Sequence, residues 1–160
     1  MINERNQTVI TDIKKLGKAQ KEFLSKNNYN GFKFEKFAYD FPRQICYFTA
    51  IEDTRFHLMV TLAFSQKLKK FKIIREFIFK DDNSLCPDCT SYKNLPALVR
   101  YFESGDVAIE YIGKDSRAHR LDGPAILESD DDGIAYAYYI NGEKFSESDY
   151  YNDLRVLIEK

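Results

Sequence analysis

Residues 95–150 contain one unit written twice: L95-P-A-L-V-R-Y-F-E-S-G-D-V-A-I-E-Y-I-G-K-D-S-R-A-H-R-L-D122, then G123-P-A-I-L-E-S-D-D-D-G-I-A-Y-A-Y-Y-I-N-G-E-K-F-S-E-S-D-Y150. The copies start 28 residues apart (123 − 95 = 28). They share a Pro-Ala pair, a glycine and a Tyr-Ile pair: Pro96-Ala97 with Pro124-Ala125, Gly105 with Gly133, and Tyr111-Ile112 with Tyr139-Ile140. A period of this length indicates one supersecondary unit stacked on a copy of itself, and such stacks usually bind other molecules.

Each copy predicts a β-hairpin. A short apolar strand follows the Pro-Ala pair, the chain turns at Gly105 or Gly133, and an aromatic-rich strand returns. Both turns have hairpin composition, because glycine beside acidic residues accepts the backbone conformations that tight turns need. Residues 147–158 predict a short closing helix, which either Ser146 or Ser148 would cap.

The N-terminal half predicts a helix on a sheet. Apolar residues recur at helical spacing over residues 4–27, with lysines on the other side, so this segment predicts an amphipathic helix. Residues 32–80 contain alternating runs that predict an antiparallel β-meander, and residues 81–94 have loop composition. The predicted fold class is therefore α+β: an N-terminal helix on a mainly antiparallel sheet, two β-hairpin repeats and a short C-terminal capping helix.

The net charge changes sign at the start of the repeats. Residues 1–93 carry 17 Lys/Arg and 11 Asp/Glu, a net +6, whereas residues 94–160 carry 7 and 14, a net −7. We therefore divide the chain into an N-terminal α+β region, 1–93, and a two-repeat region with its capping helix, 94–160, and expect them to share one core. Such asymmetry indicates different contact surfaces in the two halves.

The repeats resemble a known family. Residues 119–125 read H-R-L-D-G-P-A, Gly133 follows, and residues 138–142 read Y-Y-I-N-G. This pattern resembles the MORN-like repeats of many bacterial, phage and large-virus proteins, and residues 143–150 resemble the terminal cap of such arrays. The resemblance implies a binding scaffold of the kind carried by phage and bacterial accessory proteins. Because about three repeats are normally needed for a stable array, the two hairpins are expected to pack against the N-terminal sheet for a core.

Composition indicates a cytoplasmic protein. The chain has 44% hydrophobic and 31% charged residues, values typical of soluble globular proteins, and no apolar run long enough to span a bilayer. Residues 1–7 are polar and contain no apolar signal segment. Three cysteines make an odd count, which argues against a secreted disulfide framework.

The second hairpin is the expected partner-binding surface. Its acidic turn contains contiguous acids, which do not match the alternating positions of a calcium loop: Glu128, Asp130, Asp131 and Asp132. These acids form either a solvated hairpin tip or a face that imitates nucleic-acid phosphates in a basic groove of a protein partner. In the second interpretation, the protein inhibits a host nuclease or defence complex.

Tyrosines near this turn are expected to contribute to the same surface. They provide large contact area with a polar tip, which suits an interface, although the packing of the sheet explains them equally well. The candidates for partner binding are Tyr136, Tyr138 and Tyr150. On a strand, Tyr136 and Tyr138 would share one face.

A second interpretation places nucleic acid on the basic N-terminal half. Five cations lie close to Phe71, Phe77 and Phe79: Lys67, Lys69, Lys70, Lys72 and Arg75. Cations with interleaved aromatics are typical of nucleic-acid surfaces. The same cations are also typical of a solvated hairpin turn that protects an edge strand from aggregation.

Cys86 and Cys89 have the spacing of half a zinc site. A structural site needs four ligands, and the other soft candidates, Cys46, His57 and His119, do not pair at suitable spacing. Ordinary loop cysteines, a zinc site and a redox pair therefore all stay open.

The chain shows no recognisable catalytic pattern. His119 and Arg120 belong to the repeated motif and have no nucleophile or carboxylate at catalytic spacing. Phosphate-binding and metalloprotease motifs are absent from the sequence. We therefore expect a non-enzymatic protein with neither catalytic residues nor a cofactor, and assign no metal site.

Overall fold

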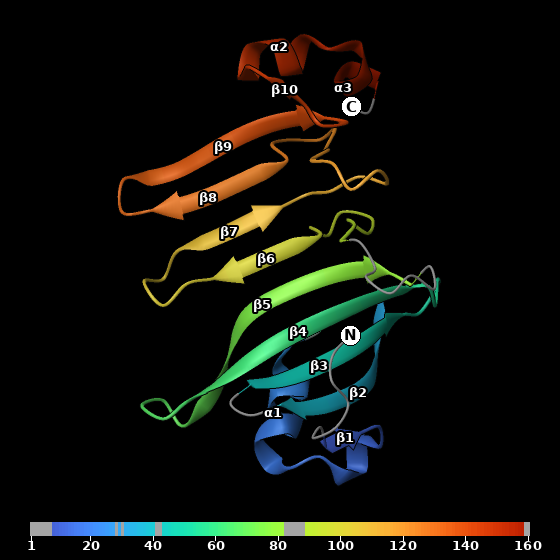
Figure 1. The fold of residues 1–160 in the computed structure, drawn as a ribbon, viewed down its shortest axis with the longest axis vertical. Helices are drawn as coiled ribbons and strands as arrows, with labels where there is room; N and C mark the ends of the chain where they lie inside the picture. The colour runs from blue at the N-terminus through green and yellow to red at the C-terminus, as the bar shows by residue number, and fades with distance from the viewer. Residues whose placement is uncertain (1–7, 28, 30, 41–42, 82–88, 159–160) are drawn as a thin grey trace. The chain divides into compact units, whose positions relative to one another are not determined.

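A computed structural model describes residues 8–27, 29, 31–40, 43–81 and 89–158. Within each of the two compact units described below, the described strands lie next to one another in the order in which they follow in the chain (Figure 1). Their bounds are β1 Thr8–Ile10, β2 Phe32–Asp40, β3 Arg43–Ala50, β4 Phe56–Ser65, β5 Lys70–Lys80, β6 Leu98–Tyr101, β7 Val107–Glu110, β8 Ile126–Asp130, β9 Gly133–Ile140 and β10 Glu143–Phe145.

The predicted α+β class is wrong, because the protein is mostly an antiparallel β structure. Helix accounts for only 15% of the chain. The helical segments are the 3-10 turn η2 Ile13–Lys15, α1 Lys18–Lys26, α2 Glu147–Asn152 and α3 Leu154–Ile158. α1 has nine residues, whereas a transmembrane helix needs about 20. None of the described helices could span a bilayer.

Residues 4–7 of the N-terminal helix predicted over residues 4–27 lie outside the described residues, and the described part is α-helical only at Lys18–Lys26. Thr8–Ile10 forms β1 instead and pairs antiparallel with β2. Its three residues, Thr, Val and Ile, are all β-branched, and such side chains favour a pleated strand over a helix. Gly17 then has an extended backbone and donates its N–H to Gln20 Oε1 (2.8 Å), so the regular helix begins only at Lys18.

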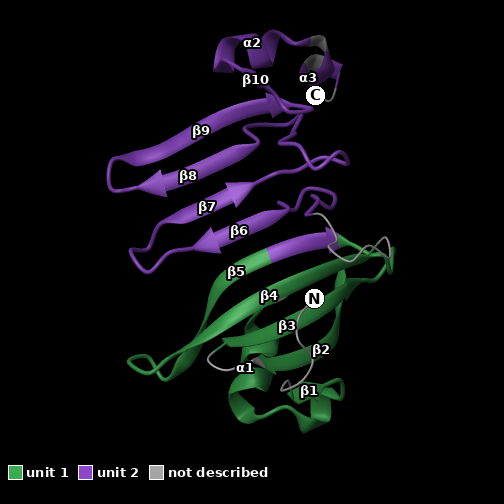
Figure 2. Ribbon diagram, in the orientation of Figure 1, with its two compact units in different colours: residues 1–76, 80–87 green, residues 77–79, 88–160 purple. Residues whose placement is uncertain are grey.

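The described chain divides into two compact units, shown in Figure 2. Unit 1 comprises residues 1–76 and 80–87. Its strands β2 to β5 confirm the meander predicted over residues 32–80. Alternate residues of these strands build the core together with Leu16 and with Phe23 of α1: Phe37, Cys46, Phe48, Val60 and Leu62.

Unit 2 comprises residues 77–79 and 88–160, so it includes the end of β5. Ile78 connects this segment to the first repeat. Its N–H donates to Ala97 O (2.8 Å), and its carbonyl accepts from Thr90 N–H (3.0 Å). Ile78 is only 2% exposed. The end of β5 is therefore a packed and hydrogen-bonded part of unit 2.

The same backbone pattern recurs one repeat later. Tyr111 N–H donates to Ala125 O (2.7 Å), and the Tyr111 carbonyl accepts from His119 N–H (3.0 Å). Ala97 and Ala125, the alanines of the two Pro-Ala pairs, are both fully buried. Ile78 thus occupies the position that Tyr111 occupies for the second repeat, so β5 supplies the strand that precedes the first hairpin.

The two hairpins have turns of different length. Residues 102–106 join β6 to β7, whereas residues 131–132 alone join β8 to β9. Ala97 N–H donates to Glu110 O, and Ala125 N–H donates to Ala137 O, both at 2.9 Å. The donors are 28 residues apart (125 − 97) and the acceptors only 27 (137 − 110). The sequence period of 28 would make Tyr138 the equivalent of Glu110, but Ala137 accepts the hydrogen bond instead. The second strand of the second hairpin is therefore shifted by one residue relative to the sequence repeat.

Helices α2 and α3 close unit 2 against the end of β9. The buried cluster there consists of Tyr138, Ile140, Tyr150 and Val156, with Leu121 and Phe145 packed against it. Of the two capping candidates, Ser146 caps α2, because its Oγ accepts from Asp149 N–H (3.1 Å). Ser146 is therefore the N-cap, and α2 begins at the next residue, Glu147.

Candidate functional site

The β8–β9 hairpin carries the acidic residues predicted for partner binding. Glu128 and Asp130 alternate along β8 and so share one face, while Asp131 and Asp132 form the turn. All four are exposed. Asp130 Oδ1 accepts from Asp132 N–H (2.9 Å), which stabilises the turn. Within the described part of the chain, none of the four forms an ion pair, so their charges face solvent.

The opposite face of the same hairpin carries two exposed apolar side chains, both on β9. Leu127 pairs with Tyr136 and Ser129 with Ile134. Tyr136 is 53% exposed and Ile134 is 60% exposed. Ser129 Oγ accepts from Val107 N–H (2.7 Å), which links β8 to β7 near the end of the sheet. The structure therefore brings Tyr136 together with the four acids on one hairpin.

Two of the three predicted interface tyrosines are core residues, which corrects the expectation that they are available to a partner. Tyr138 is 8% exposed and Tyr150 is fully buried, and their ring centroids lie 4.9 Å apart. Tyr138 Oη donates to Glu147 Oε1 (2.9 Å). Desolvation, and then the hydrogen bond to Glu147, raise the pKa of Tyr138. α2 covers this part of β9 and leaves Tyr136 open.

Tyr150 connects α2 to the segment that joins the two repeats. Its hydroxyl donates to Arg120 O (2.8 Å) and accepts from Gly123 N–H (3.1 Å). Burial is the main cause that raises the pKa of Tyr150. The Tyr150 hydroxyl satisfies the hydrogen-bonding needs of two backbone groups, so the role of Tyr150 is structural.

His119 also has a structural role in the repeat. Its Nδ1 accepts from Asn141 N–H (3.1 Å), which joins the loop to the β9–β10 turn. Desolvation, and then the charge of Arg155, lower the pKa of His119. Gly113 packs so closely that a side chain there would begin 3.1 Å from His119 Cβ. The ring is therefore neutral near pH 7 and held by close packing.

Arg120 is held by four neighbours, three of them in the same H-R-L-D-G-P-A segment. Its guanidinium lies 3.9 Å from the centroid of the Tyr111 ring. Its Nε donates to Asp122 Oδ1 (2.6 Å) and its NH1 donates to Pro124 O (3.3 Å). A Cβ at Gly123 would lie 3.5 Å from its guanidinium carbon. The H-R-L-D-G-P-A segment, which lies between β7 and β8, is thus held in place by these contacts.

The five cations of the alternative surface lie on one hairpin of unit 1. Lys67 and Lys69 lie in the β4–β5 turn, and three follow on β5: Lys70, Lys72 and Arg75. All five are exposed. Beside the turn, Phe64 and Phe71 make an edge-to-face contact with centroids 5.3 Å apart. The hairpin therefore combines cations and one exposed ring, since Phe64 is 40% exposed.

Of the three cysteines, the structure describes Cys46 and Cys89. Cys86 lies outside the described residues, and the predicted Cys86–Cys89 pair lies outside them with it. Cys89 is half-buried, and its backbone bridges to Phe79. Cys46 is fully buried, and desolvation strongly raises the pKa of its thiol. Across the described ranges, no group of three or more His, Cys, Asp or Glu residues is placed to hold a metal ion.

A polar cluster in unit 1 has no counterpart in the sequence analysis. Glu35 is a β-bulge residue, since the β2–β3 register shifts between Phe34 and Lys36. Its Oε2 accepts from Thr49 Oγ1 (2.6 Å) and lies 3.1 Å from His57 Nδ1. Burial raises the pKa of Glu35, but these hydrogen bonds outweigh that effect and lower it overall. A bulge has no reliable sequence signal, because it depends on the partner strand.

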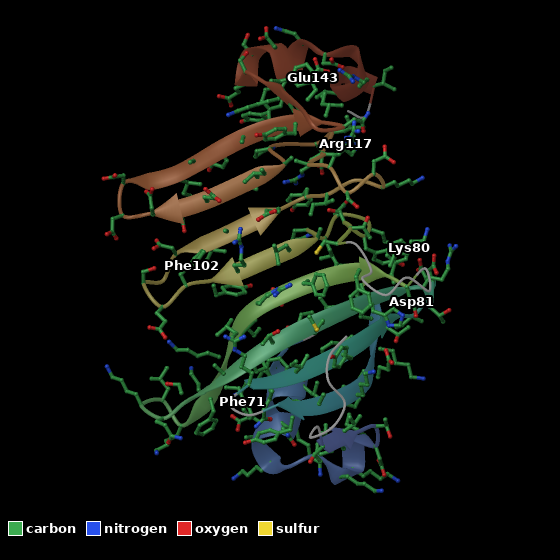
Figure 3. The ribbon with its side chains drawn as sticks, in the orientation of Figure 1. Phe71, Lys80, Asp81, Phe102, Arg117 and Glu143 are labelled. Carbon is green, nitrogen blue, oxygen red and sulfur yellow. The ribbon has the colours of Figure 1, made fainter. Side chains whose placement is uncertain are left out.

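A basic depression in unit 2 was also missed. Lys93, Lys114, Arg117 and Arg120 line it together with His119. Figure 3 shows Arg117 at the end of unit 2 opposite to Phe102. These cations come from separate loops, and the net acidity of residues 94–160 hides them. The one sequence feature that could have indicated the depression is that these cations are concentrated in loops, away from the acidic hairpin.

Comparison with protein-family models, curated proteins and solved structures gave no match for the chain. The resemblance of residues 95–150 to MORN-like repeats therefore stays a prediction from the residues. The geometry of the two hairpins and of the capping helices is independent of that resemblance.

Proposed function

We propose that this protein is a non-enzymatic interaction module that binds a protein partner through the β8–β9 hairpin. The observation that carries the proposal is the set of exposed carboxylates on one hairpin, none of which forms an ion pair within the described residues: Glu128, Asp130, Asp131 and Asp132. Like charges held together repel one another, and a basic partner relieves this repulsion.

The partner that fits this surface presents a basic groove. Four carboxylates at one hairpin end imitate the charge of nucleic-acid phosphates, and Tyr136 with Ile134 supplies exposed apolar area on the other face. A nuclease or another nucleic-acid-binding component of a host defence complex has such a groove. The resemblance to MORN-like accessory proteins of phages and bacteria supports the same class of partner.

The test is capture of partners from bacterial lysate at physiological salt, with identification by mass spectrometry. We expect Asp131→Asn/Asp132→Asn to lose a basic protein that the wild-type chain captures, because half of the hairpin charge is removed. Asp130 is kept, since it stabilises the turn. The matched control is Asp115→Asn/Glu143→Gln, which removes two exposed charges elsewhere in unit 2. Equal capture by the hairpin variant and the control would contradict the proposal.

The alternative function is nucleic-acid binding by the basic β4–β5 hairpin. Its support is the clustering of five exposed cations beside the Phe64–Phe71 ring pair. The same capture experiment separates the two functions. Nucleic acid that co-purifies with the wild-type chain, and that high salt releases, favours the alternative.

A further inference from the structure

Unit 2 contains a depression at the end of its sheet opposite to the β8–β9 turn. It has a volume of about 670 Å³ and lies between residues 90–94 and the loop 111–122, with Asn141 at its border. This volume is in the range of small-molecule sites, about 300–1,000 Å³. Strand β9 has eight residues and is about 26 Å long. The depression is therefore separate from the acidic hairpin turn.

The lining of the depression is basic although unit 2 is acidic. Residues 88–160 contain eight Lys/Arg, and four of them line this one place: Lys93, Lys114, Arg117 and Arg120. The lining acids are Asp115 and Asp122, and Arg120 already neutralises Asp122 at 2.6 Å. The formal balance of the lining is +2 (4 − 2), with His119 neutral. Such a concentration of positive charge favours an anion.

The backbone holds this loop in a defined shape. Gly113 N–H donates to Arg117 O (2.9 Å), and Gly142 N–H donates to Ala118 O (2.9 Å). The side chain of Arg117 packs closely over Gly142, where a Cβ would lie 2.9 Å from Arg117 Cδ. The loop that carries Lys114 and Arg117 is thus fixed on both sides before any ligand arrives. Preorganised cations bind an anion with less loss of conformational entropy.

Two of the cations remain available to a ligand. Within the described residues, neither Lys114 nor Arg117 forms an ion pair, and both are exposed. The guanidinium of arginine presents several N–H groups that match phosphate oxygens, and lysine adds a mobile point charge. His119 adds a donor: Asn141 N–H occupies its Nδ1, so the neutral ring carries its proton on Nε2.

We propose that this depression binds a small phosphate-bearing anion, with Lys114 and Arg117 as the principal contacts. The site is independent of the hairpin surface, because no residue of the hairpin turn lines it. The ligand class is a soluble phosphate or pyrophosphate compound, since the lining offers several cations within one cavity of small-molecule size.

The test is titration calorimetry of the full chain with inorganic pyrophosphate at constant ionic strength. We expect saturable binding that weakens about tenfold in Lys114→Glu and in Arg117→Gln, because one charged hydrogen bond is worth that order of magnitude. The matched control is Lys144→Glu, which makes the same charge change at an exposed site outside the depression. Circular dichroism and unfolding midpoints verify that each variant is folded.

Absence of saturable binding would overturn the proposal. The same holds for equal weakening in Lys114→Glu and Lys144→Glu, since that result indicates nonspecific attraction. ATP and adenosine identify the source of the phosphate. Tighter binding of ATP than of pyrophosphate supports a nucleotide, and equal binding supports the phosphate group alone. Binding of adenosine as tight as that of ATP would exclude phosphate recognition and overturn the proposal.

Discussion

At the residue scale, tyrosines have two different roles in unit 2, one at the surface and one in the core. Tyr136 is 53% exposed, whereas Tyr150 is fully buried and bonds two backbone groups. Composition assigns both to an interface, because an aromatic ring with a polar tip fits equally well at a surface and in a core. The hydrogen bonds of the hydroxyl group distinguish the two, and these depend on what lies opposite each ring.

Removing the Tyr150 hydroxyl should destabilise the protein. Tyr150→Phe keeps the ring but leaves Gly123 N–H and Arg120 O without this partner, which should lower the free energy of unfolding by about 1–3 kcal/mol. Urea unfolding followed by circular dichroism measures the change. Tyr136→Phe is the matched control and should change stability little, because that ring is exposed. Equal effects of the two substitutions would show that the hydrogen bonds of the Tyr150 hydroxyl do not stabilise the fold.

At the element scale, the end of the array depends on a short helix. α2 has six residues, and a helix this short is not stable without tertiary packing and a cap. Its packing comes from Tyr150 against Tyr138, and its cap comes from Ser146. The sequence left two serines as candidates, since each precedes a helical turn. The position of Tyr150 over β9 decides between them.

Loss of the cap should loosen the end of unit 2. Ser146→Ala removes the acceptor for Asp149 N–H, and an N-cap of this type is worth about 1 kcal/mol. Ser148→Ala is the control, because Ser148 lies inside α2, where alanine is favoured. Thermal unfolding should give a lower midpoint for Ser146→Ala only. A lower midpoint for Ser148→Ala instead would move the start of α2 to that residue.

At the scale of the whole molecule, β5 contributes to both units. Residues 70–76 and 80 of β5 belong to unit 1, whereas residues 77–79 belong to unit 2. The N–H of Ile78 donates a hydrogen bond to Ala97 O, as the N–H of Tyr111 does to Ala125 O. The two hairpins therefore start from a strand outside the repeated sequence, which compensates for an array shorter than about three units.

A fragment that keeps β5 should be more stable than one that starts after it. Residues 70–160 retain Ile78 and its bonds to Ala97 and Thr90, whereas residues 88–160 leave those backbone groups unpaired. Buried area and hydrogen bonds are lost together, so the shorter fragment should unfold at a lower urea concentration. Equal midpoints for the two fragments would contradict a role of β5 in unit 2.

Local patterns in the chain were sufficient for the strands of the meander, for both repeat hairpins and for the position of the acidic turn. Each of these depends on neighbouring residues: alternation of apolar side chains, a Pro-Ala pair before a strand, or glycine at a turn. The N-terminal helix was predicted in the same way and is largely wrong. A strand edge of β2 was available to Thr8–Ile10, and a distant edge does not appear in a local pattern.

Contacts between distant segments decided the features of unit 2 on which the proposed binding sites depend. α2 packs on β9 and so buries Tyr138 while Tyr136 stays exposed. Loops far apart in the chain bring Lys93, Lys114 and Arg117 to one depression. Burial and electrostatic potential depend on distances in space, and chain order defines such distances only for near neighbours. The 28-residue period thus specified the scaffold, and packing selected the surfaces that remain open to partners.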